Sequence, residues 1–275
     1  MPVLTVHKRL LSAYAENTDS VPESVFRTCK GAGTMKRILS LCCALPVLFG
    51  LPQISAFAAG YGQGTECDAD NRPSGAVRFQ EEYAEYGAYA LSDDRERIIL
   101  TFDQGYENGY TGQILDTLKE KQVSAIFFLT GDYAKKEPAL VRRMIAEGHT
   151  LGNHGMTHAA IPTLSDEELE QEVMSLHRYI LEQYGYEMQY FRPPCGEYDQ
   201  RSLEKVHSLG YRTVFWSMAH VDWKTDAQPE PRAALKKLTD ASHGGAVYLL
   251  HSVSPVNAEI LGDLIDAFRA KGYRV

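Results

Sequence analysis

Five short stretches of the sequence carry side chains that could bind a metal ion or move a proton. They are Thr101-Phe-Asp-Gln-Gly105, His154-Gly-Met-Thr-His158, Arg192-Pro-Pro-Cys-Gly196, Asp222-Trp223 and Leu250-His251. The imidazoles of His154 and His158 are four residues apart, so on one helix face or in a tight loop both could direct a nitrogen at one ion. Such a pair suits a borderline cation such as Zn²⁺. Two unrelated surface histidines would have the same spacing, so the pair alone is a weak indication.

The other candidate groups could orient one another. Arg192 precedes two prolines that fix the backbone, and its guanidinium could pair with Asp103 and hold that carboxylate ionised. Asp222 could orient the imidazole of His251, while the indole of Trp223 walls a sugar-sized pocket. Each residue also has a purely structural explanation, such as a turn at Asp103 or a hydrogen-bonded core position for His251.

The elements that must position these residues alternate as strand and helix from Arg97 onward. Apolar runs of strand length cover residues 98–102, 124–130, 149–153, 190–192, 211–216 and 246–250, with a last stub at 273–275. Helices are expected over residues 110–121, 137–147, 165–184, 199–209, 231–241 and 256–270. Because the loops that leave the strands of a parallel sheet meet at one edge, we expect the candidate groups to converge there.

The alternation predicts an α/β fold in which helices cover a parallel sheet. A barrel and a doubly wound sheet would both satisfy it, and a count of roughly six or seven β-α units favours a distorted (β/α) barrel. We expect this single catalytic domain over residues 97–275. Residues 59–96 are interpreted as a linker and N-terminal extension, in which 77–91 forms either an amphipathic helix or a short extended cover.

The segment before this extension has the composition of an export signal. Residues 35–58 combine a Lys-Arg start, an apolar core over 38–49 and a small-x-small site at Ala56 and Ala58. We predict a cleaved secretory signal and therefore a secreted or cell-envelope protein. A retained membrane anchor is disfavoured because two prolines interrupt the apolar run. We interpret residues 1–34 as a leader upstream of the true translation start.

Composition and net charge exclude some classes of binding partner. The 275 residues are 44% hydrophobic and 23% charged, which suits one globular domain with some extension. The net charge of −8 and the lack of a basic run argue against nucleic acid. After cleavage of the signal only Cys67 and Cys195 would remain, and two unpaired thiols are favoured over one disulfide. The serine-hydrolase pattern Gly-x-Ser-x-Gly and a phosphate-binding loop are both missing.

Taken in order, the five motifs resemble those of NodB-type polysaccharide deacetylases of carbohydrate esterase family 4. The resemblance runs from about Arg97 to Val275. The finer match is to the branch that deacetylates N-acetylmuramic acid on the way to the muramic δ-lactam of spore cortex. The stretches that carry this finer match are residues 102–111, 215–217, 221–224 and 249–253.

The resemblance implies a metal-dependent active site. Its divalent metal ion, Zn²⁺ with Co²⁺ or Mn²⁺ as alternatives, would be held by His154 and His158. Asp103 would be the general base and His251 the general acid, and Arg192 would tether the base.

The resemblance also implies supporting roles. Asp222 would orient His251, and the backbone N–H of Cys195 would help to hold the oxyanion, in a pocket that Trp223 helps to form. Most family members have a second acid that ligates the metal, and here Gln104 stands in its place. Either the Gln104 amide oxygen coordinates, or Asp103 moves onto the metal, and either arrangement should weaken ion binding.

The implied function is removal of the acetyl group from N-acetylmuramic acid by a secreted enzyme. The implied partner is the glycan strand of peptidoglycan, with no nucleic acid, no protein partner and no stable membrane anchor after signal cleavage. One alternative is a deacetylase of N-acetylglucosamine in peptidoglycan or chitin-like chains. Another is a glycan-binding relative with impaired catalysis, which the replacement of an acid by Gln104 would explain.

Overall fold

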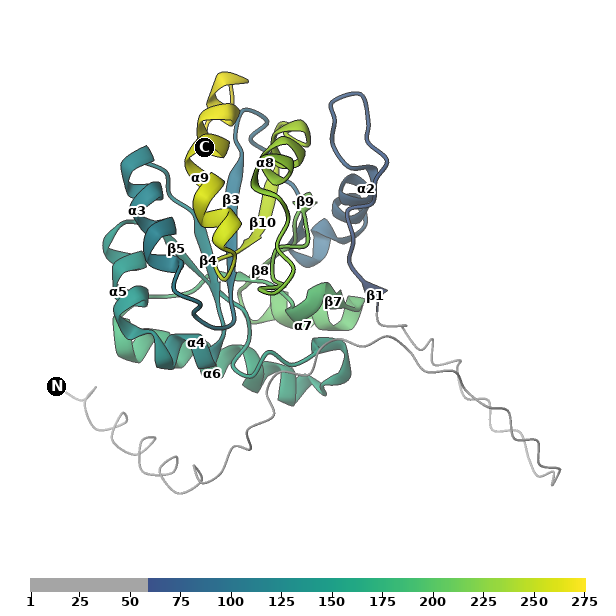
Figure 1. The fold of residues 1–275 in the computed structure, drawn as a ribbon. Helices are drawn as coiled ribbons and strands as arrows, with labels where there is room; N and C mark the ends of the chain where they lie inside the picture. The colour runs from purple at the N-terminus through teal and green to yellow at the C-terminus, as the bar shows by residue number, and fades with distance from the viewer. Residues whose placement is uncertain (1–58) are drawn as a thin grey trace, which may run out of the picture. The chain divides into compact units, whose positions relative to one another are not determined.

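The computed structural model describes residues 59–275, and Figure 1 shows their arrangement. The predicted leader, residues 1–34, and the predicted signal, residues 35–58, lie outside the described residues. Within the described part of the chain, no helix is both long enough and apolar enough to cross a membrane.

Eight short strands form one sheet in which every neighbouring pair is parallel. The strand order is β2-β8-β6-β5-β4-β3-β10-β9. The strands are β2 (Ala88–Tyr89), β3 (Ile99–Gln104), β4 (Ile126–Leu129), β5 (Thr150–Asn153), β6 (Tyr190–Phe191), β8 (Arg212–Val214), β9 (Met218–Ala219) and β10 (Val247–His251). Since β2 and β9 are the two ends of this order, the curled sheet stays open between them. The expected α/β fold with parallel strands in a distorted barrel is confirmed.

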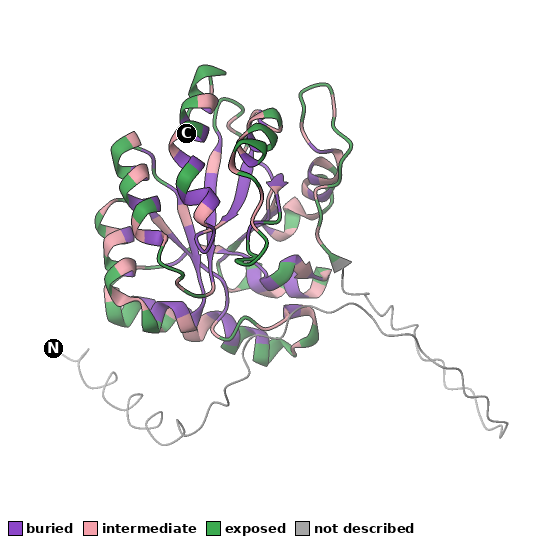
Figure 2. Ribbon diagram, in the orientation of Figure 1, coloured by how far each residue is buried: buried purple, intermediate pink, exposed green. Residues whose placement is uncertain are grey.

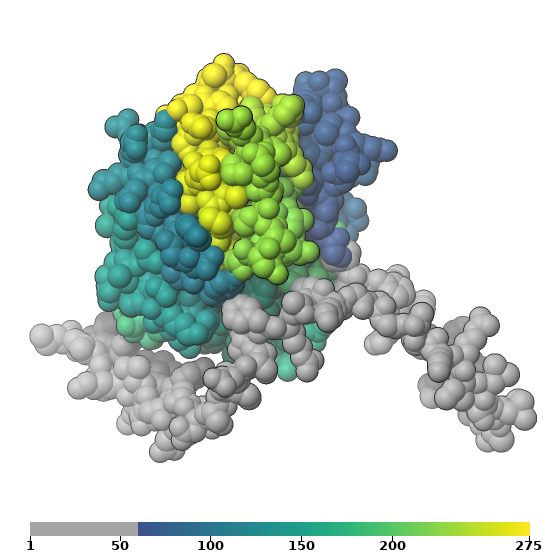
Figure 3. Space-filling model, viewed as in Figure 1, coloured from purple at the N-terminus to yellow at the C-terminus, as the bar shows by residue number. Residues whose placement is uncertain are grey.

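Helices connect and cover these strands. They are α2 (Ser74–Tyr83), α3 (Thr111–Lys121), α4 (Gly131–Lys136), α5 (Pro138–Ala146), α6 (Asp166–Tyr184), α7 (Gln200–Ser208), α8 (Pro231–Asp240) and α9 (Pro255–Ala270). The helix expected over residues 165–184 is present as α6 and begins with a capping box: Ser165 Oγ accepts from the backbone N–H of Glu168, and the Glu168 carboxylate accepts from that of Ser165. Figure 3 shows α9 packed between α3 and α8.

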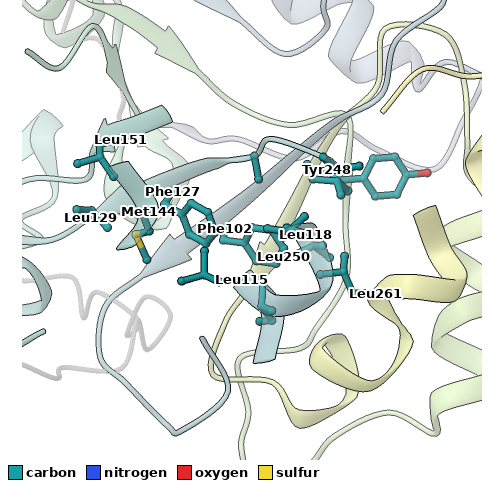
Figure 4. Packing of buried hydrophobic residues seen from close by; sticks show 14 of the residues in the cluster. Phe102, Leu115, Leu118, Phe127, Leu129, Met144, Leu151, Tyr248, Leu250 and Leu261 are labelled. Atoms are coloured by element: carbon teal, nitrogen blue, oxygen red, sulfur yellow. The ribbon is translucent and has the colours of Figure 1, made fainter. Parts of the chain in front are cut away.

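The main core lies between the outer face of the sheet and the helices. Phe102 of β3 stacks on Phe127 of β4 with ring centroids 5.2 Å apart, and Leu115 and Leu118 of α3 and Leu261 of α9 belong to the same buried cluster (Figure 4). Figure 2 shows the same division, with the strands mostly buried and the outer sides of the helices exposed. This burial holds the strands in place and thereby positions the residues at their carboxyl ends.

Alternate residues of the same strands face the other side of the sheet. A separate buried cluster there contains Phe128, Val214 and Val247. Asp103 is one residue beyond Phe102 and is paired in register with Phe128 of β4 and His251 of β10. The alternation therefore directs Asp103 to the inner side, where the candidate groups gather.

Several elements differ from the expected ones. Residues 77–91 include both of the proposed alternatives, since α2 is followed by a 3-10 turn (Ala84–Tyr86) and then by β2, which pairs with β8. Residues 88–89 are thus part of the sheet rather than of a linker. The expected strand over 211–216 is shorter, as β8, and β9 follows it outside the expected range. Helix α4 was not expected, and the final stub makes only an isolated bridge between Arg274 and Arg97.

Two further short strands connect the N-terminal extension to the body of the fold. Strand β1 (Ala59–Gly60) pairs antiparallel with β7 (Glu197–Tyr198), which directly follows the Arg-Pro-Pro-Cys-Gly loop. Cys67 and Cys195 are not joined by a disulfide, as expected.

Candidate active site

The guanidinium of Arg192 is fully buried and lies at the centre of the candidate site. Its Nη1 donates to Asp103 Oδ1 at 2.7 Å and to Thr101 Oγ1 at 2.8 Å. Its Nε and Nη2 donate to the backbone carbonyls of Val214 and Phe215 at 2.9 and 3.1 Å. These bonds anchor the charge to β3 and to the end of β8, and they fix the orientation of the Asp103 carboxylate.

Asp103 is buried with its charge partner beside it. Burial by itself raises the pKa of a carboxyl group, but the Arg192 guanidinium and the nearby imidazoles outweigh it, and the net pKa of Asp103 lies below its ordinary value. The group is therefore ionised near neutral pH, as a proton acceptor must be.

The two histidines of the predicted metal pair lie next to each other after β5. Their ring centroids are 4.9 Å apart. Nδ1 of His154 donates to the backbone carbonyl of Arg192 at 2.8 Å, which leaves Nε2 with its lone pair, 3.6 Å from Asp103 Oδ2. Burial lowers the pKa of both rings, that of His158 to about 4. Neutral imidazoles are the form that binds a metal.

A second pair of residues faces this cluster from β10. Asp222 is fully buried, and its Oδ1 accepts from Nδ1 of His251 at 2.7 Å while its Oδ2 accepts from the backbone N–H of His251 at 2.9 Å. Because a carboxylate only accepts, Nδ1 carries the proton and Nε2 is the nitrogen left for substrate. Burial lowers the pKa of His251, but the Asp222 carboxylate outweighs this and the net pKa is raised. An imidazolium can therefore persist there near neutral pH.

Gln104 lies at the last position of β3, in register one step beyond the pair of Asp103 and His251. It is fully buried, and its Nε2 donates to Ser252 Oγ at 2.5 Å. Its Oε1 is buried without a hydrogen-bond partner. A buried amide oxygen in this state is unusual unless an ion or water satisfies it.

The loop that holds Cys195 has an uncommon backbone shape. Cys195 is exposed and has φ of 56°, in the left-handed region, and Gly196 follows with φ of 66°. The backbone N–H of Gly196 donates to the Pro193 carbonyl at 3.1 Å, and a Cβ on Gly196 would lie 2.7 Å from the Trp216 ring. The loop is thus packed closely against Trp216 at Gly196, while Cys195 is exposed.

Trp223 lies beside the general-acid candidate. Its ring centroid is 5.6 Å from that of His251, and the side chain is 47% exposed. Val221, two residues earlier, is 48% exposed. These apolar groups form an exposed edge next to the imidazole of His251, a surface on which a sugar ring could stack.

The residues present fit a divalent cation in part. Two neutral imidazoles and a buried, unsatisfied amide oxygen are suitable donors, and Asp103 Oδ2 lies near His154. In residues 59–275, however, no three His, Cys, Asp or Glu side chains form a group that could hold a metal ion. The donor set of this chain therefore includes an amide or the carboxylate that would also act as base.

Sequence reasoning missed several residues that support the site. Asn257 of α9 donates through Nδ2 to Asp222 Oδ2 at 2.6 Å, and His220 Nε2 lies 3.7 Å from the same oxygen. Glu172 of α6 accepts from the loop between the paired histidines. In the sequence, Asn257 and Glu172 resemble ordinary polar residues of a helix. No local pattern marks them as residues that support the site.

Comparisons with known proteins agree with this geometry. A sequence profile of the polysaccharide deacetylase family matches residues 91–214. The chain is 38% identical to the peptidoglycan-N-acetylmuramic acid deacetylase PdaA of Bacillus subtilis over 87% of this chain and 93% of that protein. It is 29% identical to a peptidoglycan-N-acetylglucosamine deacetylase of Bacillus cereus over 72% of this chain and 93% of that protein.

The fold has a counterpart among solved structures. The structure of PdaA from Bacillus subtilis, described as a family 4 carbohydrate esterase, superposes with a TM-score of 0.75 at 36% identity. The superposition covers 80% of this chain and 95% of that chain.

Proposed function

Because the chain belongs to the polysaccharide deacetylase family, carbohydrate esterase family 4, we propose that it hydrolyses the N-acetyl group of N-acetylmuramic acid in peptidoglycan with the help of a divalent metal ion. The observation that supports this most directly is the arrangement of two charge pairs. Asp103 with Arg192 and His251 with Asp222 end neighbouring strands, in register with each other, and the paired histidines lie beside them.

In this proposal His154 and His158 hold the cation, together with the amide oxygen of Gln104 or the carboxylate of Asp103. When bound, the cation polarises the acetyl carbonyl and makes water a better nucleophile. Zn²⁺ suits the imidazole donors best, with Co²⁺ or Mn²⁺ as alternatives.

The protein groups move the protons. Asp103, kept ionised by Arg192, takes a proton from the attacking water as its oxygen bonds to the acetyl carbon. Nε2 of His251 then donates a proton to the departing sugar nitrogen as the carbon–nitrogen bond breaks. The backbone N–H of Cys195 stabilises the oxyanion, and Trp223 contacts the sugar. The products are acetate and a free amino sugar.

We propose further that the enzyme acts outside the membrane, in the cell envelope, after removal of a signal at residues 35–58. The motif resemblance supports a role in spore cortex. The amine freed on muramic acid lies near that sugar's lactyl carboxyl group, so the product is chemically suited to close into a δ-lactam.

Acetate release from defined muropeptides tests the proposal. Purified protein with Zn²⁺ or Co²⁺ should release acetate from N-acetylmuramic acid in glycans with or without peptide stems, and a chelator should stop the reaction. Absence of metal-dependent acetate release from all of these substrates would refute it.

A second candidate substrate is N-acetylglucosamine, favoured by the similarity to the Bacillus cereus enzyme named for that sugar. Side-by-side acetate release from the two sugars in one glycan distinguishes the candidates. A glycan-binding protein without turnover is a third candidate, favoured by Gln104 in place of a ligating acid. It predicts that the chain binds glycan strands but releases no acetate at any metal concentration.

A further inference from the structure

We infer that Glu172 of α6 is a positioning residue for the metal site, because its carboxylate holds the loop between His154 and His158 in the shape that brings both imidazoles to one cation. The inference rests on the proposed function, in which these two histidines bind the metal. Glu172 touches neither the substrate nor the cation in this account. It acts through the loop.

The carboxylate of Glu172 is buried, and its hydrogen-bond partners all come from this loop. Its Oε1 accepts from the backbone N–H of Thr157 at 2.7 Å and from that of Ala159 at 3.3 Å. Its Oε2 accepts from Thr157 Oγ1 at 2.9 Å, and the backbone carbonyl of Glu172 accepts from the N–H of Met156 at 3.1 Å. One helical residue therefore holds the loop at Met156, Thr157 and Ala159.

The two backbone bonds to Oε1 come from the residues on either side of His158. His158 itself has φ of 62°, in the left-handed region that residues with a side chain seldom adopt. Backbone N–H groups around such a residue point into a common concavity that favours an anion. The Glu172 carboxylate occupies that concavity, so it stabilises the backbone conformation that directs the His158 ring toward His154.

The shape of Gly155 is consistent with this role. Gly155 has φ of 86°, and a Cβ at this position would lie 2.5 Å from Glu172 Oε1. The loop thus approaches the carboxylate so closely that a side chain at Gly155 is excluded. The close approach of the loop to α6 therefore requires glycine at position 155 opposite Glu172.

The charge of Glu172 adds to its geometric effect. The Asp103 charge is balanced by Arg192, and Gln104 is neutral where the family has an acid. Among the described residues, Glu172 takes part in no ion pair, and its charge lies close enough to His158 to interact with that ring. A negative charge behind the loop also favours a cation in front of it, which partly compensates for the missing ligating acid.

The inference is tested by measuring zinc affinity in competition with a chromophoric chelator. Glu172→Gln keeps the size of the side chain but removes the charge and places an N–H₂ group against backbone donors. We expect it to weaken zinc binding by about 10- to 100-fold, the usual effect of losing a residue that orients metal ligands. The visible spectrum of bound Co²⁺ should change as well, because the ring geometry relaxes.

Two further variants keep the test decisive. Glu167→Gln removes the same charge from an exposed position on α6 and should leave zinc affinity unchanged. Thr157→Val removes only the bond from Oγ1 to Oε2 and should weaken zinc binding by a few-fold, and it serves if Glu172→Gln does not fold.

The outcomes separate the inference from the proposed function. If the wild-type chain binds zinc and both Glu172→Gln and Thr157→Val bind it equally well, the inference is overturned while the proposed function stands. If the wild-type chain binds neither Zn²⁺ nor Co²⁺, the metal-dependent function is overturned and the inference with it. Weaker zinc binding in Glu172→Gln or Thr157→Val, with Glu167→Gln unchanged, supports the inference.

Discussion

The carboxylate of Asp222 receives two hydrogen bonds from His251, one from the ring Nδ1 at 2.7 Å and one from the backbone N–H at 2.9 Å. The Asn257 amide donates a third at 2.6 Å. This arrangement fixes both the direction of the imidazole and the tautomer, and it leaves Nε2 for the proton transfer of the proposed mechanism. It also keeps a negative charge beside the ring, which raises the pKa of His251 despite burial.

Replacing that charge should shift the pH dependence of the reaction. In the wild type the Asp222 carboxylate raises the pKa of His251 despite burial, so the protonated acid persists to higher pH. Asp222→Asn removes the charge, which lowers the pKa of His251 and moves the basic limb of the kcat/KM profile to lower pH. The rate at the optimum should fall by roughly 10² to 10⁴.

A pH profile of acetate release measures this shift. Asp226→Asn is the matched control, since Asp226 is exposed four residues further along the chain. A basic limb that stays in place in Asp222→Asn would show that another group supplies the proton.

The buried pair of Asp103 and Arg192 should matter for stability as well as for catalysis. Arg192→Met leaves the Asp103 carboxylate buried without its cation, which should lower the free energy of unfolding by about 3 to 5 kcal/mol. The double variant Asp103→Asn with Arg192→Met no longer buries a lone charge and should recover part of this loss.

Urea unfolding of the wild type, both single variants and the double variant gives the coupling free energy of the pair. Asp103→Asn alone should remain folded and lose roughly 10² to 10⁴ in the rate of acetate release. Purely additive losses of stability would contradict the account of a coupled pair.

Trp223 should contribute to substrate binding and little to folding, because it is 47% exposed beside His251. Trp223→Ala should raise KM for a glycan substrate by about 5-fold, the equivalent of about 1 kcal/mol of aromatic contact, with kcat changed less. Steady-state kinetics measure the split. Leu181→Ala, a similarly exposed apolar residue on α6, should leave both constants as they are.

Gln104 should limit the affinity for metal. Gln104→Asp places a carboxylate where the amide oxygen is buried without a partner, and zinc affinity should rise by about tenfold, or 1.4 kcal/mol. The chelator competition assay measures it. Removal of the metal with a chelator should abolish acetate release in both proteins, with recovery on adding Zn²⁺. Unchanged affinity in Gln104→Asp would place this side chain outside the ligand set.

Much of the fold could be predicted from the sequence because its signals are local. The capping box at Ser165, the N-cap at Asp199 and the apolar strand that ends at His251 depend on residues within one turn or one strand. The missed elements, such as α4 and the two-residue strands β2 and β9, are too short for a periodic pattern. Each of the two strands depends on pairing with one neighbour, β8 or β10.

For the candidate site too, local signals predict the residue types but not the contacts between them. Residue type and position after apolar runs predict the candidate groups, and the fold brings them together at one edge of the sheet. They are Asp103, His154, His158, Arg192, Asp222 and His251. Their mutual contacts had no local signal. The carbonyl that fixes the His154 tautomer belongs to residue 192, and the amide that holds Asp222 belongs to residue 257.

By itself the sequence determined the parallel α/β architecture and the chemical groups available to the site, because strand and helix periods and strand-end residues can be read from neighbours in the chain. Only the tertiary structure decided which groups pair, which are buried and how the loop of His158 is held. Glu172 and Asn257 reach the site from helices rather than from the loops that carry the candidate groups, and their contacts form only once the helices have packed against the curled sheet.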